Sequence, residues 1–215
     1  MLGNKKKLKG LEDEVRLLRA QTAVNLYEKR IIYSRKDFGF IFNYLRLTGL
    51  GVEVGVRKGN YSDYLLNSWN GSVLYSVDPW LHYDDGKYVD GSNVAQKKQE
   101  RIYHEAVRKL ARYKSRSVIM RTTSTEAAAE FTDSSLDFVY LDAQHHYEAV
   151  KVDIETWLPK IRPGGVISGD DYADVETSEN VFGVRRAVDE FVAAGSHDLI
   201  LTIDGLYPSW FVVCK

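Results

Sequence analysis

The chain has 215 residues, 44% of them hydrophobic, and carries a formal net charge of −1. This length suits one α/β domain with a full core, and the near-neutral charge leaves no electrostatic footprint for nucleic acid. The single cysteine, Cys214, excludes an internal disulfide and favours a reducing compartment. Because the sequence shows no membrane-spanning apolar run and no signal-peptide core, we expect a cytoplasmic protein without a membrane partner.

The first part of the chain predicts two helices. A charged helix is expected over about residues 6–30, and a second over about 36–47 that covers the sheet or its ligand edge. The first carries an apolar seam at three-and-four spacing, formed by Leu8, Leu11, Val15 and Leu18. The seam spans barely two heptads, so this helix either packs on the flank of the domain or joins two copies in a homo-oligomer. We therefore treat 1–48 as an N-terminal helical extension and 49–215 as the main domain.

The stretch Leu50–Ser62, LGVEVGVRKGNYS, predicts a strand, a tight turn bracketed by Gly55 and Gly59, and a helix that opens near Tyr61. Such a turn lets the backbone approach a ligand closely and directs helix amide groups at its polar end. The spacing Glu-x-Gly-x-x-x-Gly, which begins at Glu53, differs from the Gly-x-Gly-x-x-Gly of nicotinamide enzymes. Glycines after a strand are a weak signal when taken alone.

A second strand, Val73–Val77, ends at Asp78, where an acid can accept both ribose hydroxyls of an adenosine. Trp80 follows and either borders a nucleoside or packs in the core. The segment His82–Asn93 has loop composition without the acid spacing of a calcium loop. We interpret it as a candidate lid or substrate loop.

The elements on either side of the central unit are simpler. A helix over about residues 94–113 leads to a third strand over 117–121, and Thr123 and Ser124 then open a helix, with hydroxyls and amides that could border an adenine. After the central unit, a helix is expected over 180–193. Two final strands, over 199–203 and 210–213, are joined by a short connection that favours an antiparallel pair.

The central unit runs from Ser135 to Tyr172 and predicts strand, helix and strand. Its first strand, Leu136–Leu141, is almost uninterruptedly apolar, as expected of a strand buried on both faces, and stops at Asp142. The helix begins near Tyr147, and its apolar face is made by Val150, Ile154, Trp157 and Leu158. Pro163-Gly164-Gly165 ends this unit. The second strand, Val166-Ile167-Ser168, stops before Asp170 and Asp171.

Such a right-handed crossover places both strands parallel, so Asp142, Asp170 and Asp171 emerge at the edge where open α/β sheets bind ligands. Three neighbouring carboxylates repel one another unless a cation lies among them, and Mg²⁺ is the natural occupant. The alternative is that these acids only cap loops and helices. On the intervening helix, Asp153 and Glu155 are expected to be solvated.

Together these motifs resemble a known family. The chain resembles the class I S-adenosylmethionine-dependent methyltransferases, in particular a small metal-dependent branch that includes sugar and catechol-type O-methyltransferases. The resemblance covers about Leu50 to the end of the chain. It depends on five motifs: Glu53 with Gly55 and Gly59, Asp78-Pro79-Trp80, Asp142 to Glu148, Pro163 to Gly165, and Gly169 to Tyr172. It implies an α/β fold with a Rossmann-like, doubly wound, seven-stranded sheet that is mostly parallel with an antiparallel last strand.

The resemblance also implies roles for individual residues. Cofactor contacts would come from Glu53, Gly55, Gly59 and Asn60 at the methionine end, from Asp78 and Trp80 near the ribose, from Thr123 and Ser124 at the adenine, and from Asp142. Mg²⁺, or another divalent cation, would be held by Asp142, Asp170 and Asp171. Catechol-type enzymes carry a catalytic lysine where this chain has His145, and a histidine can act as a general base near neutral pH. Asp142 is expected to be the second catalytic residue.

The expected reaction is O-methylation of a small molecule such as a sugar or a glycosylated metabolite. The alternatives are an NAD(P)-dependent oxidoreductase and a protein that binds S-adenosylmethionine without turnover. The missing glycine fingerprint and the antiparallel last pair count against the first, and the complete set of acids counts against the second. Methylation of nucleic acid is disfavoured because LDAQ stands where an Asn-Pro-Pro-Tyr-like motif would be expected.

Overall fold

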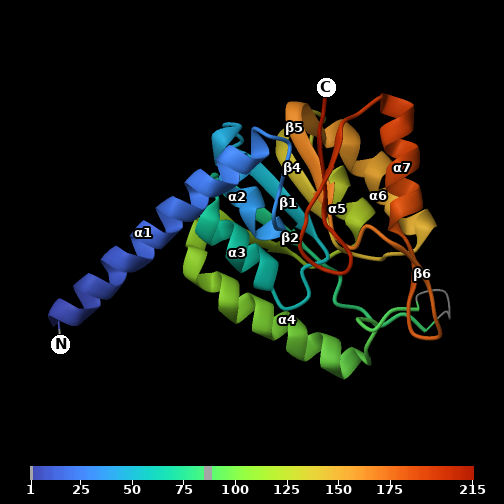
Figure 1. The fold of residues 1–215 in the computed structure, drawn as a ribbon. Helices are drawn as coiled ribbons and strands as arrows, with labels where there is room; N and C mark the ends of the chain where they lie inside the picture. Colours follow the sequence, from blue (N-terminus) through green and yellow to red (C-terminus); the bar gives the residue numbers. More distant parts are fainter. Residues whose placement is uncertain (1, 85–88) are drawn as a thin grey trace.

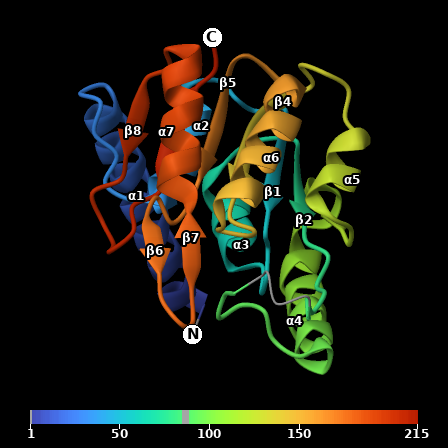
Figure 2. The same ribbon diagram turned by 90° about the vertical axis from the view of Figure 1, so that its right-hand side faces the viewer.

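A seven-stranded sheet forms the centre of the protein in a computed structural model that describes residues 2–84 and 89–215. Figures 1 and 2 show this sheet with helices on both sides. Its strands, in spatial order, are β3 (Ser117–Met120), β2 (Val73–Val77), β1 (Leu50–Val54), β4 (Leu136–Leu141), β5 (Ile161–Gly169), β9 (Trp210–Val213) and β8 (Leu199–Leu201). All neighbours from β3 to β5 are parallel, whereas β9 runs antiparallel to both β5 and β8. The predicted Rossmann-like arrangement, with its antiparallel last strand, is confirmed.

Helices cover the two faces of the sheet. On one face lie α1 (Leu2–Tyr27), α2 (Phe38–Tyr44), α3 (Asn60–Ser68) and α4 (Gln96–Leu110); on the other lie α5 (Ser124–Ala129), α6 (Tyr147–Trp157) and α7 (Val184–Gly195). Three short 3₁₀ helices are η1 (Arg35–Asp37), η2 (Ala111–Arg116) and η3 (Leu158–Lys160). Across the described ranges, no helix has the length and apolarity that a membrane span requires.

The central strand β4 shows why the sequence forms two cores. All of its residues are buried, and successive side chains of a strand point to opposite faces. Phe138 and Tyr140 therefore join the cluster under α2, α3 and α4, while Val139 and Leu141 join the cluster under α5, α6 and α7. Each fully buried apolar side chain of this size contributes roughly 1.5–3 kcal/mol, so β4 anchors both layers.

The N-terminal segment divides into a projecting helix and a buried one. Figure 1 shows α1 extending away from the body, and Leu8, Leu11, Val15 and Leu18 are each more than half exposed. In contrast, Phe38, Ile41 and Phe42 of α2 are fully buried. The ring of Phe42 stacks on that of Phe138, with centroids 4.1 Å apart. The α2 helix therefore completes the core on its face of the sheet.

The structure corrects the predicted helix over residues 180–193. Its first residues form the strand β7 (Val181–Gly183), which pairs antiparallel with β6 (Asp174–Glu176), and α7 begins only at Val184. Backbone amides in β7 find distant partners, because Val181 donates to the carbonyl of Val89 and Gly183 to that of His145. Tertiary hydrogen bonds thus override the local helical pattern. The remaining helix keeps the predicted apolar spacing.

Candidate active site

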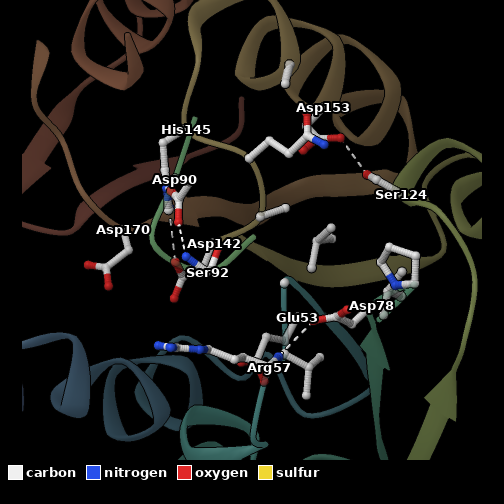
Figure 3. A pocket seen from close by; sticks show the side chains of 18 of the residues that line it. Glu53, Arg57, Asp78, Asp90, Ser92, Ser124, Asp142, His145, Asp153 and Asp170 are labelled. Carbon is white, nitrogen blue, oxygen red and sulfur yellow. Dashed lines mark hydrogen bonds and ion pairs between the residues drawn. The ribbon is translucent and has the colours of Figure 1, made fainter. Parts of the chain in front are cut away.

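A cavity of about 830 Å³ opens at the carboxyl edge of the parallel strands (Figure 3). The loops after β1, β2, β3 and β4 line it, represented by Gly55, Asp78, Thr123 and Asp142. Open α/β sheets bind ligands at this edge, and ligand pockets commonly occupy about 300–1,000 Å³. The volume is sufficient for a nucleoside-sized cofactor together with a second small molecule.

The glycine turn after β1 has the geometry that its sequence predicts. Gly55 has φ +90°, and a Cβ added there would lie 1.9 Å from the carbonyl oxygen of Asp142. Gly59 has φ +69° and precedes α3 as its N-cap. Asn60 lines the cavity and accepts a hydrogen bond from Lys109 Nζ. Side chains are thereby excluded where the β1 and β4 loops meet, and backbone faces the ligand.

Glu53 is 1% exposed and lies at the floor of the cavity. Its carboxyl accepts a hydrogen bond from the hydroxyl of Ser62, which in turn lies 2.9 Å from that of Ser76. Burial raises the pKa of Glu53 to about 8, and the Ser62 hydrogen bond only partly opposes this rise. Near neutral pH Glu53 can therefore present an O–H donor as well as acceptor oxygens to a ligand.

Asp78 is held in place by backbone amides. The amide of Arg57 donates to Oδ2 at 2.8 Å (Figure 3). The amide of Trp80 donates to Oδ1 at 2.7 Å. Each carboxylate oxygen keeps a further lone pair for a ligand hydroxyl. Trp80 itself is 1% exposed, and its indole packs on Tyr103 and donates to the carbonyl of Arg57. Of the two positions predicted for Trp80, beside a nucleoside or packed in the core, the structure has the indole packed in the core.

The far end of the cavity, beside Thr123 and Ser124, holds a residue that we expected to be solvated. Asp153 is only 7% exposed and lines the cavity. Its Oδ1 accepts the hydroxyl proton of Ser124 at 2.5 Å, and Ser124 Oγ accepts a hydrogen bond from Trp157 Nε1 at 2.8 Å. Burial raises the pKa of Asp153 to about 6, opposed by the Ser124 hydrogen bond. The prediction for Asp153 was wrong because α5 packs over this side of α6.

Thr123 has the capping role that its position predicts. Its hydroxyl accepts from the amide of Glu126, and the Glu126 side chain accepts from the Thr123 amide, which completes a capping box at the start of α5. Thr123, Ser124 and Thr125 all line the cavity. The loop after β3 thus presents a helix start to the ligand.

Asp142 and Asp171 converge with His145 at the opposite end. One side-chain atom from each of the three residues lies within 4.8 Å of the others, a spacing that could hold a metal ion. His145 Nε2 is 3.4 Å from Asp142 Oδ1 and 3.5 Å from Asp171 Oδ2. Burial, followed by the charge of Asp170, raises the pKa of Asp171 to about 6. Two of the three predicted metal ligands therefore face one another across an imidazole.

Asp170, the third predicted ligand, has a protein cation beside it. The Arg35 guanidinium bonds Asp170 Oδ2 and lies 3.2 Å from Asp142 Oδ2, while Ser209 Oγ donates to Asp170 Oδ1 at 2.6 Å. Arg35 also donates to the hydroxyl of Tyr140 at 3.0 Å. Sequence reasoning missed Arg35, although unpaired acids at a buried edge require a cation from some part of the chain.

Arg35 reaches the acids because a capped turn positions it. Ser34 is the N-cap of η1: its hydroxyl accepts from the Lys36 amide, and Asp37 bonds back to the Ser34 amide. The sequence of this capping box, SRKD, is a pattern typical of a turn start, but it carries no information about what the turn faces. The turn thus sets the guanidinium over the sheet edge.

Asp90 is a second residue that sequence reasoning missed. It accepts the Nδ1 hydrogen bond of His145 at 2.8 Å. Burial would raise the pKa of Asp90, but this bond and hydrogen bonds from Ser92 lower it to about 2. Burial alone would lower the pKa of His145, but hydrogen bonds with Asp142 and Asp90 raise it to about 10. In this structure the imidazole is protonated near neutral pH and donates to both acids.

Asp90 belongs to the segment that we interpreted as a lid or substrate loop. Residues 85–88 of that loop lie outside the described residues. The described part closes against the β6–β7 hairpin, where the amide of Gly91 donates to Asn180 Oδ1 at 3.3 Å. Asp90, Asn180 and Phe182 line the cavity, and the Phe182 ring packs on His145 with centroids 4.6 Å apart. Both segments therefore border the space beside His145.

Comparison with known proteins identifies a family for the central part of the chain. Residues 52–172 match the family described as methyltransferase domain. A curated relative, the uncharacterised protein y4gI of Sinorhizobium fredii, is 34% identical over 148 residues, which are 69% of this chain and 15% of that protein. The chain therefore spans about 15% of the length of this relative, which is far longer.

Solved structures share the fold at low identity. An O-methyltransferase from Bacillus cereus in complex with SAH has a TM-score of 0.58 at 18% identity and covers 84% of this chain and 80% of that one. A candidate caffeoyl-CoA O-methyltransferase from Staphylococcus aureus scores 0.60 at 15% identity and covers 98% and 99%. An rRNA methylase from Streptococcus thermophilus scores 0.53 at 12% identity over 81% and 95%. Because these neighbours have different acceptors, the fold alone does not choose one.

Proposed function

This chain belongs to the family of class I S-adenosylmethionine-dependent methyltransferase domains, and from that premise we propose that it methylates a hydroxyl group of a small, polyhydroxylated molecule such as a sugar or a glycosylated metabolite. We propose further that a divalent cation, Mg²⁺ or a similar ion, assists the reaction. The single observation that carries the proposal is the convergence of Asp142, His145 and Asp171 beside the cavity that also contains Asp78 and Glu53.

The donor set fits a divalent cation. Asp142 and Asp171 offer carboxylate oxygens, the ligands that Mg²⁺ prefers, and His145 adds an imidazole nitrogen, which suits Mn²⁺ or Zn²⁺ better. Asp170 would join them only if Arg35 withdrew from its carboxylate. When bound, a divalent cation lowers the pKa of a hydroxyl that it contacts. A single atom, His145 Nε2, cannot serve as ligand and as general base at the same time, so we assign the ligand role to the acids.

His145 supplies the base in the proposed reaction. The acceptor oxygen attacks the methyl carbon of the sulfonium, the carbon–sulfur bond breaks, and S-adenosylhomocysteine leaves with the electron pair. The acceptor proton passes to His145 Nε2, which must be unprotonated to receive it. Asp142 and Asp171 raise the pKa of His145, so neutralising their charge lowers it towards the range where a base can act.

The cavity walls hold the reactants in place. Asp78 would fix the ribose and the glycine turn the methionine end, so that the methyl group points towards Asp142 and His145. Holding nucleophile and methyl at near-attack distance supplies much of the acceleration in such reactions. Asn180, Phe182 and Ser92 border the space on the acceptor side, and their mixture of amide, aromatic and hydroxyl groups suits a hydroxylated ring.

The contacts of Arg35 support a second version of the same reaction without a metal. The guanidinium already pairs with Asp170 and Asp142, and protonated His145 lies beside Asp142 and Asp171. Together with Asp90, which accepts from His145 Nδ1, four acids therefore face two protein cations. In this version the acceptor hydroxyl is oriented by Asp142 and Asp171, and its deprotonation is slower.

Calorimetric titration with S-adenosylhomocysteine, with and without Mg²⁺ and beside an NAD control, tests the cofactor. We expect micromolar or tighter binding of the nucleoside, no binding of NAD, and at least tenfold weaker binding to Asp78→Asn. The matched control is Asp63→Asn, an acid on the adjacent helix α3 that pairs with Arg112 outside the cavity. Absence of nucleoside binding in both conditions would refute the proposal.

Transfer of a labelled methyl group to a panel of sugars and glycosides tests the acceptor and the metal. Turnover that stops on adding chelator and returns with Mg²⁺ or Mn²⁺ supports the metal-assisted version. Full activity in chelator would refute it in favour of the version with Arg35. Labelling of catechols or of RNA, with none of the sugars, would contradict the proposed acceptor class.

A further inference from the structure

We propose that Asp153 selects the nucleobase of the cofactor by accepting a hydrogen bond from the exocyclic amino group of adenine. This inference rests on the proposed function, because it requires the cavity to bind an adenosine. It adds a specificity-determining residue on α6, outside every motif that identified the family.

The position of Asp153 is that of a ligand contact rather than of a surface acid. Figure 3 shows it beside Ser124, at the end of the cavity away from Asp170 and His145. It is 7% exposed, yet it lines the cavity. If Asp78 holds the ribose and Asp142 faces the methyl group, the base must lie on the side of the loop after β3, where Ser124 and Asp153 meet.

The hydrogen bonds at this end leave an acceptor open on Asp153. Ser124 gives its only hydroxyl proton to Asp153 Oδ1 and accepts from Trp157 Nε1, so its hydroxyl has no donor left for a ligand. The side chains of Thr122 and Thr123 both donate to Glu126. Asp153 Oδ2 has no hydrogen-bond partner among the described residues. Asp153 lines the cavity and Oδ2 is not one of the buried unpaired atoms, so this oxygen is open to the cavity and can accept a hydrogen bond from a ligand.

Adenine supplies such a donor. Its amino group carries two N–H bonds and can give one to Asp153 Oδ2 while the ring packs in the cavity. Hypoxanthine has a carbonyl oxygen in place of the amino group, and an oxygen facing the carboxylate repels it. Its nearest donor is the N–H at ring position 1, which does not occupy the place of the amino group. Sites built to hydrogen-bond a ligand group reject analogues that lack it more strongly than apolar pockets can. The cavity should therefore discriminate between the two bases.

The alternative is that Asp153 only supports the packing of α5 on α6 through Ser124. A supporting residue would affect all nucleosides equally when changed, because the cavity would loosen as a whole. A residue that contacts the amino group would change the ratio between adenine and hypoxanthine ligands. The ratio of two affinities therefore separates the two roles.

The experiment compares S-adenosylhomocysteine with its deaminated analogue, S-inosylhomocysteine, by calorimetry. For the wild-type protein we expect at least tenfold tighter binding of the adenine compound. Asp153→Asn can turn its amide to present either oxygen or N–H, so its ratio should fall to within about threefold of unity. The matched control is Glu155→Gln, a neighbouring exposed acid on the same helix, which should keep the wild-type ratio.

Each outcome has a separate meaning. Equal binding of the two compounds by the wild-type protein overturns the inference without any variant, even if Asp153→Asn fails to fold. An unchanged ratio in a folded Asp153→Asn also overturns it, while binding of S-adenosylhomocysteine leaves the proposed function intact. Binding of neither compound by the wild-type protein overturns the cofactor assignment and this inference together.

Discussion

The two ends of the cavity are built in different ways. The end at Ser124, Asp153 and Trp157 is assembled from two helices that pack directly on each other, and of these three residues only Asp153 can carry a charge. The end at Asp142 and Asp170 is dense in charge and draws Arg35 and Asp90 from distant parts of the chain. The first end is suited to rigid recognition. At the second end, the positions of the charged side chains depend on how well the turn that carries Arg35 and the loop that carries Asp90 pack against the sheet edge.

The largest effect should come from His145 at the charged end. His145→Ala removes the proposed base, so we expect kcat to fall by about 10²–10⁴-fold, with S-adenosylhomocysteine affinity changed less than threefold. Single-turnover methyl transfer beside calorimetry checks both values. His146→Ala is the control, since the His146 side chain makes no capping bond to α6. Loss of nucleoside affinity in proportion to kcat would show that His145 acts on binding instead.

Asp153 should make stability depend on pH in the free protein. Its pKa is raised to about 6 from the ordinary 3.8, so the folded state binds this proton more tightly than the unfolded state does. The stabilisation is therefore complete below about pH 4 and is lost as pH rises through 6, with an upper limit of roughly 3 kcal/mol.

Chemical denaturation at several pH values checks this prediction as a difference between wild type and Asp153→Asn. Taking the difference isolates the contribution of Asp153 from that of Glu53, whose pKa is also raised. The two profiles should diverge between pH 4 and 6. Parallel profiles would mean that ionising Asp153 does not change the free energy of unfolding. The end at Ser124 would then lack the buried acid that distinguishes it from the charged end.

Arg35 should stabilise the charged end in competition with divalent cations. Arg35→Gln leaves Asp142 and Asp170 without their guanidinium, and because Arg35 is about one third exposed we expect a loss of about 2 kcal/mol. Mg²⁺ should then raise the Tm of the variant by more than that of the wild type. Lys36→Gln, a neighbouring cation with no acid partner among the described contacts, is the control. An equal Mg²⁺ response in both proteins would argue against competition at these acids.

The smallest effects should come from two helix caps, one at each end. Ser34→Ala and Thr123→Ala each remove an N-cap, which costs about 1 kcal/mol. Although thermal denaturation should show similar losses, kinetics should separate them. Ser34→Ala frees the Arg35 turn and should lower kcat by several-fold, while Thr123→Ala should raise the KM for S-adenosylmethionine. The same kinetic defect in both variants would contradict the proposal that the two ends of the cavity have separate roles.

The sequence was sufficient for the sheet and for the residues that end its strands. Asp78, Asp142 and Asp170 follow apolar runs, and parallel strands bring such residues to one edge whatever the rest of the chain does. Arg35 and Asp90 could not be found in this way, because they reach the edge through loops whose docking depends on tertiary contacts. Asp153 was misjudged since helical periodicity gives the face of a residue but not the neighbouring helix that covers it.

The position of β9 has a consequence for biosynthesis. This strand lies between β5 and β8, and Trp210 and Phe211 are almost completely buried there. While the nascent chain is being made, β5 remains an open strand edge until residue 213 has left the ribosome. An exposed edge of this kind is a template for pairing with other chains. A chain that is interrupted before β9 is complete should therefore be an aggregation-prone product that chaperones must hold, rather than a weakened enzyme.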